Sequence, residues 1–378
     1  MISQIGPKSL GIELVRQYVQ KTQGPGLDGT VHKSWNYESG IVLKGIECVS
    51  QLTEHGQYFE YLRNVVNRVV TPDGTILGYS PEDYNLDHIN EGKLLFGLLR
   101  KTGDERYRKA IDLLVTQMQR QPRTKSGGFW HKKIYPFQIW LDGVYMSSPF
   151  LAQYAKEFDQ PVWMDDVVGQ ILLLEEHTRD ARTGLLYHAW DETGEEQWAD
   201  PKTGCSPHFW GRAVGWFTMA ITDVLDFLPL NHPKRVSLID VFQRLINALI
   251  EVQDPYSGLW CQVLDYPLSN GNYFESSCSV MFIYSIAKGV RKGYLAPRFA
   301  RHAQTAYKGL LLHRIDRDNK GAIHLTHCNA VAGLGNTPYR DGSYEYYVQE
   351  KMTTDDAKAL GALMLACVEL SRLDAAAE

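Results

Sequence analysis

One pattern repeats six times along the 378 residues. Each unit has a glycine turn, an aromatic or histidine residue a few positions later, a polar and aromatic loop, and then two apolar helical segments. The intervals between successive markers run from 45 to 74 residues, which is enough for two helices and a loop of variable length. The marker glycines are Gly29, Gly74, Gly128, Gly184, Gly258 and Gly321.

Helix pairs of this kind bury their second faces only against neighbouring pairs. A chain this long would otherwise favour two or three domains, but the repeat predicts one domain across residues 1–378. We therefore expect an all-α protein, an (α/α)6 barrel with inner helices starting near residues 39, 87, 141, 208, 274 and 354. Strand signals are confined to short pieces in the loops, such as residues 74–78 and 322–327.

The twelve expected helices are paired across short breaks that contain glycine or proline. One of the twelve starts at the break of residues 55–58, which is similar to residues 102–107 at the start of the helix expected at 106–120. The others are expected at about residues 8–21, 39–53, 87–100, 106–120, 141–158, 163–180, 208–227, 236–252, 274–291, 297–314 and 354–373.

Charge and cysteine usage exclude several classes of protein. The formal charge of −5 provides no basic stripe for nucleic acid, and no apolar run is long enough to be a signal or membrane segment. Six cysteines without a Cys-x-x-Cys pair indicate reduced thiols. We expect a cytoplasmic monomer or weak homo-oligomer with no cofactor and no metal, since His324 and His327 lack a third ligand.

The residues between Gly127 and Met146 carry the strongest functional signal. Asp142 stands at the head of an apolar helix, where lost solvation would let a carboxyl group hold its proton and act as a general acid. Asp87 has the same position relative to its own helix, so the two acids could share a pocket. For both residues the alternative is a helix cap, because aspartate is favoured at helix starts.

Three further residues occur at comparable positions before or within inner helices. Arg212 lies about one helical turn from Trp210 and Trp216, and a guanidinium between aromatic walls suits a carboxylate or sugar hydroxyls. A buried structural ion pair would explain Arg212 equally well. His131 and His188 each follow an aromatic residue near a marker glycine, which makes them equivalent in the repeat, although loop histidines are often only hydrogen-bonded spacers.

Four segments together resemble glycoside hydrolase family 105, the bacterial unsaturated rhamnogalacturonyl hydrolases. They are Gly-Gly-Phe-Trp-His at 127–131, Gln-Ile-Trp-Leu-Asp-Gly-Val-Tyr-Met at 138–146, Thr-Gly-Leu-Leu-Tyr-His-Ala-Trp-Asp at 183–191, and Phe-Trp-Gly-Arg-Ala-Val-Gly-Trp at 209–216. The resemblance implies the (α/α)6 fold, with Asp142 as proton donor and Asp87 as the second pocket carboxylate. The expected substrate contacts are Asn36, Tyr37, His131, Lys132, Tyr135, Trp140, His188, Trp210, Arg212 and Trp216.

The implied substrate is an unsaturated galacturonyl-rhamnose oligosaccharide. The implied reaction protonates the C4=C5 enol ether at C4 and adds water at C5, so that rhamnose or a rhamnosyl oligosaccharide leaves. Three alternatives remain open: an unsaturated glucuronyl hydrolase acting on glycosaminoglycan disaccharides, a sugar 2-epimerase on the same barrel, and a non-catalytic sugar-binding toroid. The segment 329–341 is longer than the family pattern, which leaves the subsite preference open.

Overall fold

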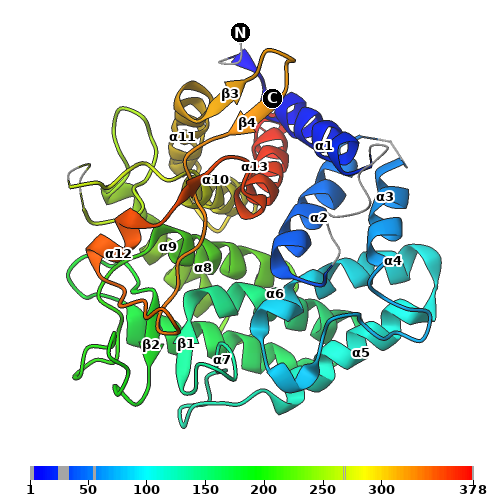
Figure 1. The fold of residues 1–378 in the computed structure, drawn as a ribbon, viewed down its shortest axis with the longest axis horizontal. Coiled ribbons are helices and arrows are strands. Elements are labelled where there is room, and N and C mark those ends of the chain that lie inside the picture. Colours follow the sequence, from blue (N-terminus) through cyan, green and yellow to red (C-terminus); the bar gives the residue numbers. More distant parts are fainter. Residues whose placement is uncertain (1–3, 24–33, 54–56, 267, 269, 377–378) are drawn as a thin grey trace.

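The computed structural model describes residues 4–23, 34–53, 57–266, 268 and 270–376. Six helical segments form its closed inner ring, in which each packs against the next and the last packs against the first (Figure 1). The ring consists of α2 (Tyr37–Ser50), the 3-10 helix η3 (Leu86–Gly92) continued by α4 (Lys93–Thr102), α6 (Leu141–Glu157), α8 (Gly211–Val224), α10 (Ser276–Arg291) and α13 (Ala357–Ala375).

An outer layer of helices covers this ring. Five outer helices follow their inner partners in the chain, whereas α1 packs against α13, so the first and last helices form the sixth pair. The arrangement is the predicted (α/α)6 barrel. The outer helices are α1 (Pro7–Gln23), α3 (Gln57–Val66), α5 (Glu105–Arg120), α7 (Pro161–Thr178), α9 (Arg235–Glu251) and α11 (Ala300–His313).

Burial explains which helices lie inside. In α10 every residue from Ser276 to Gly289 is buried, as expected for a helix surrounded by others. Glycines allow neighbouring inner helices to touch closely: a Cβ on Gly361 of α13 would lie 2.6 Å from the carbonyl carbon of Ile41 in α2. The apolar core runs around the whole ring, as a single domain requires, and the single-domain organisation of residues 1–378 stays a prediction.

Several predicted helix bounds were wrong. The helix expected from residue 87 to 100 is a 3-10 helix up to Gly92 and becomes α-helical only at Lys93. The helices expected from residues 208 and 354 begin at Gly211 and Ala357, because Trp210 has extended backbone and Asp356 caps the later start. Two short helices were not predicted, η2 (Pro81–Asp83) and α12 (Tyr344–Gln349). The helix expected from residue 297 begins as the 3-10 helix η4 (Pro297–Phe299), and the α-helix starts at Ala300.

Strands occur in the loops as two-stranded antiparallel pairs. The prediction at residues 322–327 is confirmed by β4 (Ile323–Leu325), which pairs with β3 (Ile315–Arg317). Residues 74–78 contribute only an isolated bridge between Val70 and Ile76. The other pairs, which were not predicted, are β1 (Gln138–Trp140) with β2 (Ala189–Asp191), and β5 (Cys328–Asn329) with β6 (Met352–Thr353).

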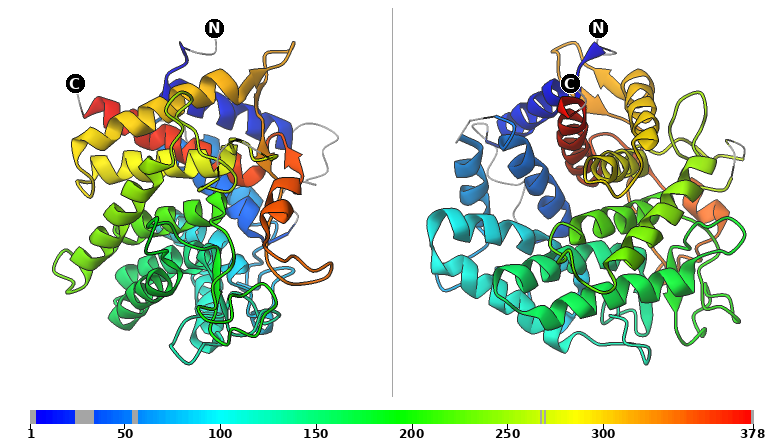
Figure 2. Two further views of the ribbon diagram at one scale, coloured as in Figure 1. Left: turned by 90° about the vertical axis from the view of Figure 1, so that its left-hand side faces the viewer. Right: turned by 180° about the vertical axis from the view of Figure 1, so that it is seen from behind.

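The long loops gather at one end of the barrel. Figure 2 shows α12 and the orange segment after β5 on one side of the helices, and β1 ends immediately before the inner helix α6 begins. Residues that precede the inner helices therefore meet at that end. Marker Gly29 and residues 55–56 of the predicted helix break at 55–58 lie outside the described residues.

Candidate active site

The inner helices begin with a repeated hydrogen bond that puts four repeats in register. The backbone N–H that starts each helix donates to a carbonyl in the loop of the following repeat. The pairs are Leu86 to His131 at 3.1 Å, Leu141 to His188 at 3.1 Å, Gly211 to Gln262 at 2.9 Å, and Ser276 to His327 at 3.1 Å. The second residues of these helices, Asp87, Asp142, Arg212 and Ser277, therefore occupy equivalent positions on neighbouring helices.

The same register brings each loop histidine to a carboxylate. His131 Nε2 lies 3.8 Å from Asp87 Oδ1, and His188 Nε2 lies 3.3 Å from Asp142 Oδ2. The predicted equivalence of the two histidines is confirmed. Neither aspartate is the N-cap residue of its helix, since Asn85 and Trp140 have that position.

Asp87 is held as an anion. Burial raises the pKa of this carboxyl group, but Lys132, whose Nζ lies 2.6 Å from Oδ2, together with His131 outweighs burial and lowers the pKa below its ordinary value. The ammonium group of Lys132 supplies most of this effect at neutral pH, because His131 is uncharged there. Asp87 is therefore suited to accepting hydrogen bonds or a proton.

His131 forms a layered aromatic wall. Its ring stacks on Trp140 with centroids 4.5 Å apart, and Trp140 stacks on Tyr135 at 4.8 Å. Burial lowers the pKa of His131 to about 4, so the imidazole is neutral at physiological pH. Gly143 makes room for this ring, since a Cβ there would lie 2.9 Å from His131 Nδ1.

Gly143→Ala should therefore disturb the site although alanine is the better helix former. We expect the added methyl group to displace His131 from Trp140 and to lower kcat/KM by about tenfold, the equivalent of roughly 1.4 kcal/mol. Gly169→Ala in α7 is the matched control, because a Cβ at Gly169 would meet no atom within 4 Å, and it should leave kinetics unchanged. Equal kinetics for the two variants would contradict the packing role of Gly143.

Asp142 has a different environment from Asp87. Its Oδ2 is buried toward His188 and has no hydrogen-bond partner among the described residues, while the side chain as a whole is 14% exposed. Oδ1 is thus the oxygen left to face the pocket. Behind the pair, His188 Nδ1 and the Tyr347 hydroxyl are 2.8 Å apart, which fixes the imidazole.

Arg212 is a buried cation without a carboxylate partner in the described part of the chain. The residue is 1% exposed, and its guanidinium donates to the carbonyls of Asn329 and Ala330 and to the Ser277 hydroxyl. Burial lowers its pKa, but Asp356 and Glu275 overcome this effect and raise it, so the charge persists. A structural ion pair, the alternative considered from the sequence, is absent among the described residues.

Glu275 and Asp356 already have other hydrogen-bond partners. Glu275 accepts hydrogen bonds from the N–H groups of Ser277, Cys278 and Asn329, and Asp356 caps α13. The guanidinium itself lies over the Trp210 ring at 4.8 Å. Arg212 can therefore offer a charged donor to an anionic ligand.

A pocket of about 480 Å³ joins these groups. Ten of the twelve predicted site residues line it: Tyr37, Asp87, His131, Lys132, Tyr135, Trp140, Asp142, Trp210, Arg212 and Trp216. Burial and the neighbouring Asp87 raise the pKa of Tyr37 well above its ordinary value, so its hydroxyl remains a donor. The sequence did not identify four further lining residues, Met146, Val331, Ala332 and Arg340.

Two predicted site residues do not line the pocket. His188 is fully buried behind Asp142. Asn36 is the N-cap of α2, where its side chain accepts from the Ser39 N–H, and its own N–H donates to buried Glu91 at 2.8 Å. Both residues are therefore placed to position neighbours rather than to contact a ligand.

The segment 329–341 forms one wall of the pocket. Val331 and Ala332 come from it, and Arg340 is anchored by bonds to the Gly335 and Leu334 carbonyls and to the Tyr135 hydroxyl at 2.9 Å. The unusual length noted in the sequence thus bears directly on the pocket. Among the described residues no group of three metal-ligand side chains occurs, and no described helix is long and apolar enough to cross a membrane.

An (α/α)6 barrel with helix-head acids, a buried arginine and stacked aromatic rings at one end defines a pocket of the sugar-binding class. Comparison with known proteins gives the same class. The model of Glycosyl Hydrolase Family 88 matches residues 12–374. A family 105 glycoside hydrolase of known structure from C. acetobutylicum ATCC 824 is 43% identical, with 95% of this chain and 98% of that chain covered and a TM-score of 0.91.

More distant relatives extend the comparison. Unsaturated rhamnogalacturonyl hydrolase YesR of Bacillus subtilis is 26% identical over 252 residues, which are 65% of this chain and 68% of the relative. An unsaturated glucuronyl hydrolase specific for heparin shares the fold, with a TM-score of 0.72 at 13% identity over 99% and 98% of the two chains. The present chain belongs to Glycosyl Hydrolase Family 88 and is similar to the family 105 enzymes, which confirms the resemblance and makes it a hydrolase.

Proposed function

We propose that this protein hydrates the C4=C5 double bond of a terminal unsaturated galacturonic acid in rhamnogalacturonan lyase products and so releases rhamnose or a rhamnosyl oligosaccharide. The observation that carries the proposal is the buried, carboxylate-free Arg212 in the same pocket as Asp142. A uronate supplies the missing anion for Arg212, and its ring would lie against the aromatic side chains. The similarity to YesR supports rhamnogalacturonan as the source of the substrate.

Asp142 is the proton donor in this proposal. Transfer of its proton to C4 builds positive charge at C5 that the ring oxygen shares, and the resulting carboxylate then accepts a proton from the water that adds at C5. The hemiketal formed opens to a ketone, and the sugar attached at C1 leaves from the open-chain product. This sequence needs one acid–base group rather than two acids at a set separation.

The neighbouring groups position the substrate. Asp87, held as an anion by Lys132, would accept a hydrogen bond from a sugar hydroxyl. Trp210 and Trp216 bracket the uronate site near Arg212, and Arg340 with Lys132 would contact the part of the oligosaccharide toward the loops. We further propose a cytoplasmic location, since all six cysteines are free thiols.

The test is incubation with lyase-digested rhamnogalacturonan, followed by ultraviolet absorbance and product mass. The proposal expects loss of the absorbance of the conjugated enol ether and release of rhamnose or a rhamnosyl oligosaccharide. Unsaturated glycosaminoglycan disaccharides, assayed in parallel, represent the alternative substrate. Faster loss of absorbance with those disaccharides would replace the proposed substrate, and unchanged absorbance with both would contradict hydration altogether.

A further inference from the structure

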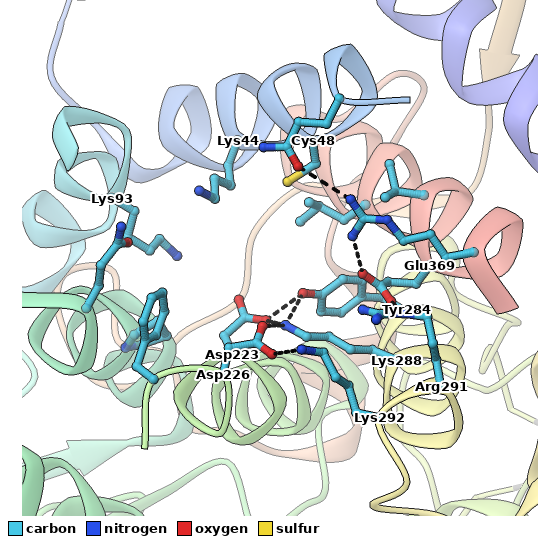
Figure 3. Close-up of a pocket in the computed structure, with 17 residues that line it drawn as sticks. Lys44, Cys48, Lys93, Asp223, Asp226, Tyr284, Lys288, Arg291, Lys292 and Glu369 are labelled. Atoms are coloured by element: carbon cyan, nitrogen blue, oxygen red, sulfur yellow. Dashed lines mark hydrogen bonds and ion pairs between the residues drawn. The ribbon is translucent and has the colours of Figure 1, made fainter. Parts of the chain in front are cut away.

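A second cavity lies inside the inner ring, at the end of the barrel away from the candidate active site. All six inner segments line it, five of them through their second halves and α4 through its first residue, Lys93 (Figure 3). Its open volume is about 920 Å³. Tyr145 lies between the two cavities, because its ring contacts Lys93 at 3.8 Å and stacks on Trp216 at 4.7 Å. The proposed reaction uses none of the residues of this second cavity.

The second cavity carries an excess of positive charge. Three carboxylates line it, Asp223, Asp226 and Glu369, and Glu47 next to it pairs with one of the lysines at 2.6 Å. Six described cationic side chains face these four acids, which leaves two cations in excess. The six cations are Lys44, Lys93, Lys288, Arg291, Lys292 and Arg372.

Most of these cations are already paired. Lys288 Nζ lies 2.6 Å from Asp223 and 2.8 Å from Asp226, which also holds Lys292 at 2.7 Å. Arg291 and Arg372 share Glu369, at 2.6 and 3.2 Å. Figure 3 shows this network on one side of the cavity. Because the acids are occupied, they leave no carboxylate for a further cation.

Lys93 is the cation left over. It is 4% exposed, and its Nζ has no hydrogen-bond partner among the described residues. Its contact with the Tyr145 ring is a cation–π interaction, which satisfies none of the three N–H donors. In Figure 3 the side chain points into the cavity from the side opposite the acid network. A buried ammonium without an acceptor is costly unless a ligand supplies one.

We propose that this cavity binds a small dianionic oxyanion, either inorganic phosphate or the phosphate group of a sugar phosphate, with Lys93 as its principal ligand. Two negative charges balance the two excess cations, and phosphate oxygens accept several charge-assisted hydrogen bonds. Lys292 and Arg372, both 35% exposed at the side chain, provide the solvent-facing approach. Asp223, Asp226 and Glu369 also face the ligand, so their occupied carboxylates limit the affinity.

The environment of Lys93 makes the binding depend on pH. Burial lowers the pKa of Lys93 to about 7, with Asp223 and Cys48 acting in the opposite direction and Lys44 and Lys288 acting in the same one. An anion prefers the protonated amine, so for a ligand of fixed charge the affinity falls as pH rises through the Lys93 pKa. This sign follows because deprotonation removes the charge that the ligand contacts.

The experiment is titration calorimetry of the full chain with inorganic phosphate and, separately, glucose 6-phosphate, one pH unit below and above the Lys93 pKa. We expect saturable one-to-one binding. Because phosphate gains its second negative charge over the same pH range, the effect of Lys93 is measured as the affinity of the wild type relative to that of Lys93→Arg, and this ratio should fall at the higher pH. Lys93→Met should weaken it by about tenfold or more, as loss of a charged hydrogen bond predicts. Lys101→Met, on the same helix but exposed, should bind like the wild type. Tighter binding of glucose 6-phosphate would identify a sugar phosphate as the ligand, and tighter binding of inorganic phosphate would identify the free ion.

Lys93→Arg separates a folding defect from a lost ligand contact. Arginine stays charged over this range, so the pH dependence of phosphate binding to this variant should follow the ionisation of the ligand alone. Absence of saturable binding to the wild type, or wild-type affinity in Lys93→Met, would overturn the proposal. Loss of binding in Arg212→Met rather than Lys93→Met would also overturn it, because the anion would then occupy the catalytic pocket.

Discussion

Asp142→Asn should lower kcat on the unsaturated substrate by about a hundredfold to ten-thousandfold, the usual cost of losing a general acid or base. Asparagine keeps the size of the side chain and can still contact His188, but it cannot deliver a proton to C4. KM should change far less, because in the proposal the uronate is held by Arg212 and the aromatic wall. The rate of absorbance loss at saturating substrate gives kcat.

Asp240→Asn is the matched control for this variant, since it makes the same substitution at an exposed position of α9. It should keep wild-type kinetics, and the two variants should unfold at similar temperatures. Near-normal turnover by Asp142→Asn would show that another group donates the proton. Asp87 would then be the next residue to replace.

The structure makes Asp87 a weaker candidate for the acid than the sequence suggested. Lys132 balances the Asp87 charge at 2.6 Å, and the lowered pKa of His131 leaves it neutral. The histidine in ion-pair range of Asp142 is His188 instead. The acid–base environment of Asp142 is therefore formed mainly by its own repeat and the next one.

The repeat explains why much of the fold could be predicted from sequence. The sixfold repeat of helix pairs, with candidate site residues before alternate helices, indicated both layers and their closure into a ring. Because the repeat also fixes which residue starts each helix, it placed Asp87 and Asp142 at equivalent positions. The 3-10 start of η3 and the strand pairs β1–β2 and β5–β6 depend on contacts between segments distant in sequence, which periodicity does not encode.

The parts that sequence did not predict share a physical cause. Arg340 lies at the pocket because its guanidinium donates hydrogen bonds to carbonyls in its own loop and to the Tyr135 hydroxyl. No sequence motif predicts these contacts. In the sequence, Lys93 looks like an ordinary charged residue in a helical pattern. Its lack of a hydrogen-bond partner becomes apparent only when all six inner segments are assembled. The carboxylate-free state of Arg212 is likewise a property of the assembled barrel, since Glu275 and Asp356 are near it but bonded elsewhere.

The lack of a carboxylate partner for Arg212 leads to the second large predicted effect of a substitution. Arg212→Met preserves much of the side-chain volume and removes the charge, so kcat/KM should fall by about a hundredfold, mainly through a higher KM. Loss of charged hydrogen bonds at roughly 1.5–3 kcal/mol each accounts for this size. Arg212→Lys should recover part of the loss, because the ammonium keeps the charge but not the two-pronged geometry of the guanidinium.

A substrate whose uronate is methyl-esterified tests whether Arg212 binds the carboxylate of the substrate. If Arg212 binds the carboxylate, esterification should lower the kcat/KM of the wild type. The loss should be about as large as the one that Arg212→Met causes on the unesterified substrate. The variant acting on the ester should then show little further loss, since the interaction is already absent. Additive losses would mean that Arg212 acts through the Asn329 and Ala330 carbonyls that it also contacts. In that case Arg212 would shape the pocket wall, and Lys132 or Arg340 would be the cation to test against the uronate.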